Sequence, residues 1–93
     1  MQKKTVTVQN INGIHCRPSS AIVRAAMPFK SELRAECASG NANLKSMIEI
    51  ITLALTQGAD VTIITEGEDE VAALEMMCEK FTEIYDYPDK QNN

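Results

Sequence analysis

The sequence predicts an α+β domain of the open-faced sandwich type, in which helices cover one face of a β-sheet. The 93-residue length allows one small domain with one hydrophobic core. Periodicity along the chain gives the order strand, helix, strand, strand, helix, strand, helix. The strands alternate polar and apolar residues, so we expect one face of the sheet to meet water. Residues 1–88 should form this single domain, followed by a polar tail at residues 89–93.

The first strand and the first helix are predicted near the N-terminus. Residues 5–9 alternate polar and apolar side chains, which is typical of a half-buried strand. Farther along, Ile22, Ala26 and Phe29 recur at helical spacing on one stripe. Pro28 should end this helix, because the residue before a proline is driven out of helical geometry.

A hairpin is predicted next. Residues 32–37 alternate strictly between polar and apolar side chains and predict the second strand. Residues 38–41 read Ala-Ser-Gly-Asn and predict a turn. The short segment 42–45 can therefore return as the hairpin partner.

The second half of the pattern contains a helix, a strand and a last helix. Residues 47–57 predict the second helix, which should end at Gly58. Ile48, Ile51 and Leu55 should lie on one side of this helix. Residues 60–65 predict a central strand. The apolar stripe of the last helix should be Val71, Leu74, Cys78, Phe81 and Tyr85, with an acidic first turn and a polar tail from Tyr87.

The composition limits the classes of function. The net charge is −4 and nine Lys and Arg residues are spread without a cluster, so we expect no nucleic-acid or anionic-membrane partner. No segment resembles a signal peptide or approaches the ~20 apolar residues of a membrane span, which predicts a cytoplasmic protein. Three widely spaced cysteines predict neither a zinc site nor a redox pair, and Cys37 and Cys78 should be small core residues.

His15 is the only histidine, and its neighbours indicate a functional site. Gly13 lets the backbone turn before the histidine, and Pro18 is typical of a helix start. The amide donors and the positive dipole end at a helix start favour an anion, and Arg17 adds a cation. A neutral imidazole has a nucleophilic nitrogen near pH 7. These residues together favour a phosphoryl group carried on His15.

Three runs of residues resemble a known family. They are Gly-Ile-His-Cys-Arg-Pro at 13–18, Asn-Leu-Lys-Ser at 43–46 and Gln-Gly-Ala-Asp-Val-Thr-Ile at 57–63. Their order and spacing are similar to those of the histidine-containing phosphocarrier (HPr) family, over residues 3–85. The resemblance implies a four-stranded antiparallel sheet backed by three helices.

The same resemblance implies a role in the bacterial phosphoenolpyruvate:sugar phosphotransferase system. His15 would accept a phosphoryl group at Nδ1 from phosphorylated enzyme I and pass it to an EIIA domain of a sugar permease. Arg17 would neutralise the phosphate. Such a protein is a carrier and not an enzyme, needs no cofactor or metal, and is expected to be a monomer.

A second reading from another class stays open at this point. A regulatory module of the same fold would act on a kinase, a permease or a transcription factor. The intact His15 site favours the carrier, because a pure regulator would not need it. The neighbouring genes would distinguish the two readings.

Ser46 has two readings as well. In the family, the matching serine is phosphorylated in many bacteria by an ATP-dependent HPr kinase/phosphorylase. The residues themselves predict a capping box, in which Ser46 and Glu49 exchange hydrogen bonds with backbone donors at the start of a helix. The family commonly has glycine where this chain has Glu49, and a carboxylate there would repel a phosphate on Ser46.

The resemblance also implies a partner-docking surface on the first two helices. Its residues would be Ser20, Arg24, Met27, Met47, Ile48 and Ile51. Cys16, where the family commonly has alanine or threonine, is not expected to form a nucleophilic pair with the adjacent His15. A thiol at a helix start is still a candidate for oxidation.

Overall fold

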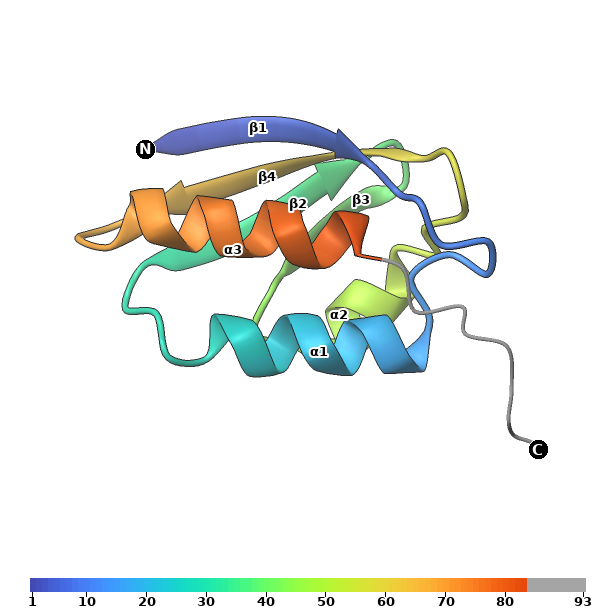
Figure 1. Cartoon of the computed structure of the whole chain (residues 1–93), viewed down its shortest axis with the longest axis horizontal. Helices are drawn as coiled ribbons and strands as arrows, with labels where there is room; N and C mark the ends of the chain where they lie inside the picture. The colour runs from blue at the N-terminus through green and yellow to red at the C-terminus, as the bar shows by residue number, and fades with distance from the viewer. Residues whose placement is uncertain (84–93) are drawn as a thin grey trace.

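The computed structural model describes residues 1–83 and confirms the expected element order (Figure 1). The elements are β1 (Gln2–Thr7), α1 (Cys16–Ala26), β2 (Glu32–Cys37), β3 (Gly40–Asn43), α2 (Met47–Thr52), β4 (Asp60–Glu66) and α3 (Glu70–Thr82). Tyr85 and the tail from Tyr87 lie outside the described residues.

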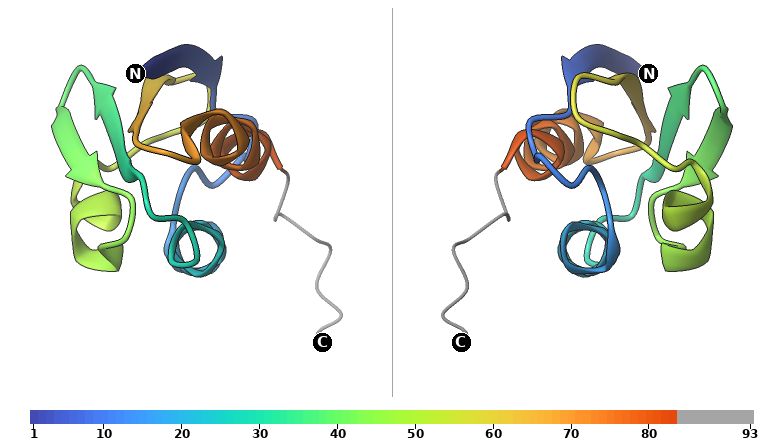
Figure 2. Two further views of the ribbon diagram at one scale, coloured as in Figure 1. Left: turned by 90° about the vertical axis from the view of Figure 1, so that its left-hand side faces the viewer. Right: turned by 90° about the vertical axis from the view of Figure 1, so that its right-hand side faces the viewer.

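The four strands form one antiparallel sheet in the order β1-β4-β2-β3, and the three helices cover the same face of it (Figure 2). In β4, Val61 and Ile63 are buried as the alternation predicts, but Ile64 and Thr65 are buried as well, so the alternation of burial fails toward the end of the strand. On the opposite face, Thr62 meets Thr5 of β1 through a hydroxyl–hydroxyl hydrogen bond of 2.8 Å. The fold is therefore the expected open-faced sandwich.

The core lies between this sheet and the helices. α1 contributes Ile22 and Ala26, and α3 contributes Ala73, Met77 and Phe81, all fully buried. α1 and α3 contact each other and run in opposite directions (Figure 1). Their first turns therefore lie at opposite ends of the molecule.

The prediction for α2 is wrong in length, and Leu55 therefore does not share a helix face with Ile48 and Ile51. The helix ends at Thr52 rather than at residue 57, because Ala54 adopts a positive φ of 54° and turns the chain. Within α2, Ile50 is buried, whereas Ile48 and Ile51 are exposed. Leu53 and Leu55, which follow the helix, are buried. The predicted helix 47–57 therefore combined α2 with the connection that follows it.

Smaller shifts affect the other elements. The first strand is displaced toward the N-terminus, since its pairing follows the length of β4, from Gln2 opposite Thr65 to Thr7 opposite Asp60. Likewise β3 begins at Gly40, directly after a two-residue turn.

The buried stripe of α3 is also rotated from the predicted one. It runs through Ala73, Met77 and Phe81, and Val71 is 57% exposed. Cys37 and Cys78 are half-buried and pack against the margin of the core rather than inside it. Burial raises the pKa of the Cys78 thiol.

Candidate functional site

The loop before α1 is held tightly against the connection after α2. Ile14 N–H donates to the Leu55 carbonyl at 3.0 Å, and Gly13 N–H donates to the Asn10 carbonyl at 3.0 Å. Gly13 has a φ of +73°, and a Cβ at this position would lie 2.1 Å from the Leu55 oxygen. Glycine is therefore required here both for its backbone conformation and for the close approach.

His15 follows this loop and occupies the N-cap position of α1, with extended backbone angles. Its carbonyl accepts the first helical hydrogen bond, from Ser19 N–H at 2.9 Å. The residue is half-buried, and its Nε2 atom is enclosed by the protein. The ring therefore has Nε2 turned into the structure.

The first turn of α1 has a composition that suits an anion. Residues 16–19 are Cys, Arg, Pro and Ser, so this turn has a cation and no carboxylate. Cys16 and Arg17 are exposed, and Pro18 is buried. A proline is tolerated in a first turn because the amides there have no helical acceptor. The turn can contribute backbone donors, dipole and guanidinium to a phosphate near His15.

Ser46 lies at the N-cap of α2, and half of the expected capping box is present. Ser46 Oγ accepts from Glu49 N–H at 3.3 Å. The predicted return bond, from Ser46 N–H to the Glu49 carboxylate, is wrong. Glu49 Oε1 accepts from Asn43 N–H at 2.8 Å instead. Ser46 N–H is already bonded to the Asn43 carbonyl at 3.0 Å, so it is not available to the carboxylate.

His15 and Ser46 lie near opposite ends of α1. Lys45 Nζ donates to the Phe29 carbonyl at 2.6 Å, which places the start of α2 beside the end of α1. The connection after α2 returns to the loop before His15. An 11-residue helix is about 16 Å long, so the two sites are separate.

The residues expected to form a docking surface belong to α1, its C-cap Met27 and α2, and the two helices contact each other. Arg24 donates to Ser20 Oγ at 3.0 Å, so these two side chains are joined one helical turn apart. The large apolar side chains exposed on this surface are Met27, Ile48 and Ile51, and Ile48 is 75% exposed. Met47 is half-buried.

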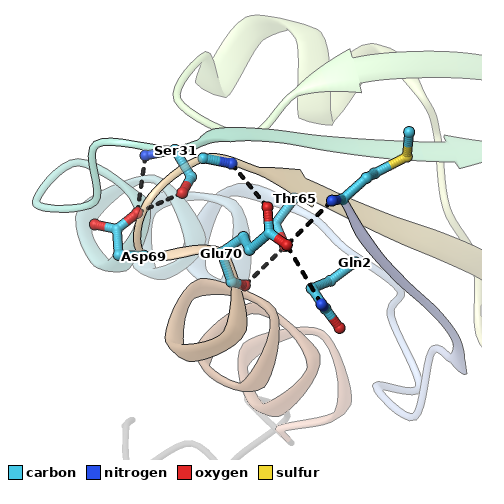
Figure 3. A network of polar contacts seen from close by, with 7 residues as sticks. Gln2, Ser31, Thr65, Asp69 and Glu70 are labelled. Atoms are coloured by element: carbon cyan, nitrogen blue, oxygen red, sulfur yellow. Dashed lines mark hydrogen bonds and ion pairs between the residues drawn. The ribbon is translucent and has the colours of Figure 1, made fainter.

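A polar network fixes the start of α3 at the other end of the molecule (Figure 3). Asp69 accepts hydrogen bonds from the Ser31 hydroxyl and from the N–H groups of Lys30 and Ser31, both at 2.9 Å. The Ser31 hydroxyl is the largest cause that lowers the pKa of Asp69, to about 2. The pKa of Glu70 is lowered by hydrogen bonds from the Gly67 N–H, the terminal ammonium and Gln2. These carboxylates are fully engaged in holding the fold.

Three cations that are scattered in the sequence line one shallow cavity of about 300 Å³. They are Lys30, Arg34 and Lys45, and Glu32 lines the same cavity. The expectation that the cations form no cluster is therefore wrong at this place. Within residues 1–83, no group of His, Cys, Asp and Glu side chains could hold a metal ion. No helix in that range has the length and apolar character needed to cross a bilayer.

The fold is a sheet of order β1-β4-β2-β3 backed by three helices, with a histidine at the start of a helix. This arrangement is the one expected of a small phosphoryl-carrier domain, because a helix start favours a bound anion. The particular carrier follows from comparison with known proteins. The chain belongs to the HPr family, since the model described as "PTS HPr component phosphorylation site" matches residues 2–83.

Named relatives agree with this assignment. The chain is 40% identical to phosphocarrier protein HPr of Lysinibacillus sphaericus, over 90% of this chain and 96% of that protein. It is 41% identical to phosphocarrier protein HPr of Haemophilus influenzae, over 81% and 88% of the two chains. The crystal structure of an HPr from Bacillus anthracis superposes with a TM-score of 0.82 at 33% identity, over 87% of this chain and 96% of that one.

The carrier reading is therefore confirmed over the purely regulatory one. The protein is an HPr phosphocarrier of the phosphotransferase system, which transfers a phosphoryl group as phosphohistidine and is not a catalytic enzyme. Membership of the family implies enzyme I and EIIA as its partners.

Proposed function

We propose that His15 is the phosphoryl acceptor and that Nδ1 is the atom that reacts. The observation that carries this proposal is the position of His15 at the N-cap of α1, two residues before the exposed Arg17. The enclosure of Nε2 supports Nδ1 as the nucleophile. The Nδ1 lone pair forms a bond to phosphorus while the bond from phosphorus to the enzyme I imidazole breaks. The same exchange, with His15 as the leaving group, delivers the phosphoryl group to EIIA.

Arg17 has a charge-neutralising role in this proposal. It is the second residue of α1 and is exposed, so its guanidinium can approach a phosphoryl group on the N-cap residue. Charge-assisted hydrogen bonds of this kind contribute about 1.5–3 kcal/mol. These hydrogen bonds stabilise the phosphoryl group while it passes between two imidazoles, and they leave it accessible to the next partner.

The direct test is labelling with enzyme I, Mg²⁺ and phosphoenolpyruvate. One acid-labile, base-stable phosphate should appear on the wild-type protein, and none on His15→Ala. Circular dichroism should show that the variant is folded, since His15 is not part of the core. A label that persists on folded His15→Ala would disprove the assignment.

We further propose that enzyme I and EIIA dock on the outer surface of α1 and α2, formed by Ser20, Arg24, Met27, Met47, Ile48 and Ile51. Exposed apolar side chains grouped on one surface are typical of an interaction site. Ile48→Glu should raise the Kd for enzyme I at least tenfold without lowering the melting temperature. Val71→Glu is the matched control, because Val71 is also exposed but belongs to α3. Equal Kd values for the two variants would place docking elsewhere.

We also propose that the protein is a cytoplasmic monomer, because the core of the described residues is formed by helices and strands of a single chain. Sedimentation velocity at micromolar concentration should give the mass of one chain, 10.3 kDa. A stable dimer under these conditions would contradict the monomer.

We also propose Ser46 as a regulatory phosphorylation site for an HPr kinase/phosphorylase. Ser46 lies at a helix start that is separate from His15, and its hydroxyl accepts only a long bond of 3.3 Å from Glu49 N–H. Incubation with the kinase and ATP should label wild type and leave Ser46→Ala unlabelled. A label on Ser46→Ala would assign the modification to another residue.

A further inference from the structure

A buried asparagine joins the histidine loop to the far end of the sequence. Asn10 is 0% exposed, although its side chain is polar. Its Nδ2 donates to the Glu83 carbonyl at 2.9 Å, at the C-terminal end of α3. Its own carbonyl accepts from Gly13 N–H at 3.0 Å. A buried amide is retained at a site only when its hydrogen bonds are made, so its conformation is fixed by these partners.

We propose that Asn10 is a positioning residue for phosphoryl transfer. By fixing the loop against α3, it holds the His15 ring in the orientation that presents Nδ1. The inference rests on the proposed role of His15.

The contacts of the loop include an attachment on each side of its exposed tip. Ile11 and Asn12 form the tip and are exposed. Before the tip, Asn10 attaches the chain to α3 through its side chain. After the tip, Ile14 attaches it to the connection after α2 through Leu55. These three segments lie together at one end of the molecule (Figure 1).

Loss of the Asn10 side chain would remove the attachment of this loop to α3. The Asn10 carbonyl, which accepts from Gly13 N–H, would then be less firmly placed, so the turn that leads into His15 could shift. A misplacement of about 1 Å in a reacting group is enough to slow a reaction strongly. The docking surface on α1 and α2 would remain in place.

The chain offers a matched control at the other end of the same helix. Thr65 is also 0% exposed, and its hydroxyl donates to the Glu70 carbonyl at 2.8 Å (Figure 3). Thr65→Val and Asn10→Ala each remove one buried side-chain donor to a backbone carbonyl of α3. Only Asn10 is near His15, so the two variants separate a positioning role from a general loss of stability.

The experiment compares both variants with wild type below their melting temperatures. We expect both to melt at lower temperature. Only Asn10→Ala should slow phosphoryl transfer from phosphorylated enzyme I, by tenfold or more in kcat, with KM for the carrier changed less than threefold. The ring ¹⁵N shifts of His15, which report the fraction of the Nε2–H tautomer, should change only in Asn10→Ala.

Two results would overturn the proposal. One is a kcat for folded Asn10→Ala within twofold of wild type with unchanged ring shifts. The other is an equal slowing by Thr65→Val. If Asn10→Ala does not fold, Asn10→Ser, whose hydroxyl is too short to reach Glu83, is measured in its place. Failure here leaves the labelling of His15 intact, whereas a label on His15→Ala would remove the proposed function itself.

Discussion

The first turns of α1 and α3 lie at opposite ends of the molecule and differ in the charge of their side chains. α3 begins with Asp69 and Glu70, whose carboxylates are held by hydrogen bonds from their own chain. α1 begins with Cys16 and Arg17 and has no carboxylate in its first turn. A helix start favours negative charge. The chain supplies that charge itself at α3, whereas at α1 we propose that a phosphoryl group supplies it.

The two ends also differ in how they are held. At α3, side chains of Ser31, Gln2 and Glu70 form a network around the helix start. At α1, the attachments include the backbone contact of Ile14 and the side chain of Asn10. The comparison indicates that close contacts between distant segments hold the histidine end, so removing one of them should be costly.

The largest effect should come from Gly13→Ala. The new Cβ would meet the Leu55 carbonyl oxygen at 2.1 Å, and the backbone has a φ of +73°. We expect a loss of about 4 kcal/mol in unfolding free energy, because strain and a backbone clash combine. Gly58→Ala is the control, since Gly58 has a φ of +87° and open space around its Cβ position. It should lose only about 1 kcal/mol. Urea unfolding measures both, and equal losses would contradict the close approach at Leu55.

The next largest effect should come from changes of charge at the start of α1. Arg17→Ala should slow transfer about 10–100-fold, which corresponds to the ~1.5–3 kcal/mol of a charge-assisted contact. Cys16→Asp gives α1 an acidic first turn like that of α3, and should slow transfer about tenfold while raising stability by ~0.3–1 kcal/mol. Cys16→Ser is the neutral control. If rapid-quench rates for both charge variants stay within twofold of wild type, the anion-receiving role of this turn is wrong.

A smaller effect is expected at α2. Glu49→Gly removes the acceptor for Asn43 N–H and introduces a flexible glycine, so it should lower the unfolding free energy by about 1–2 kcal/mol. Glu49→Gln keeps an oxygen acceptor and should lower it by less than ~0.5 kcal/mol. Both changes remove a negative charge near Ser46 and should speed its phosphorylation by an HPr kinase. Equal stability of the two variants would show that the contact with Asn43 contributes nothing.

The smallest effect should be a pH dependence at the start of α3. The folded pKa of Asp69 is lowered to about 2 from an ordinary value of 3.8. A lowered carboxyl pKa stabilises the fold above the unfolded value, and this stabilisation is lost as the pH falls from about 5 towards 2. Asp69→Asn should therefore melt at a temperature that depends less steeply on pH in this window, while Glu68→Gln should follow wild type. Parallel melting curves for Asp69→Asn and wild type would exclude this contribution.

The fold class, the order of the elements and the position of His15 were determined by the sequence by itself. Each depends on local preferences. Alternation in residues 32–37 and 60–65 predicts strands, and Gly13 and Pro18 predict a turn followed by a helix start. Such preferences act between residues that are close in the chain, so they are readable without the structure.

Tertiary structure decided the rest, because the deciding partners are distant in sequence or compete for the same group. The apolar run at 47–57 continues beyond α2 because Leu53 and Leu55 are buried by other elements and not by helical periodicity. Glu49 binds Asn43 because Ser46 N–H is already occupied. Asn10 carried no signal in the sequence, since its partner Glu83 is 73 residues away and only the packing of α3 brings the two together.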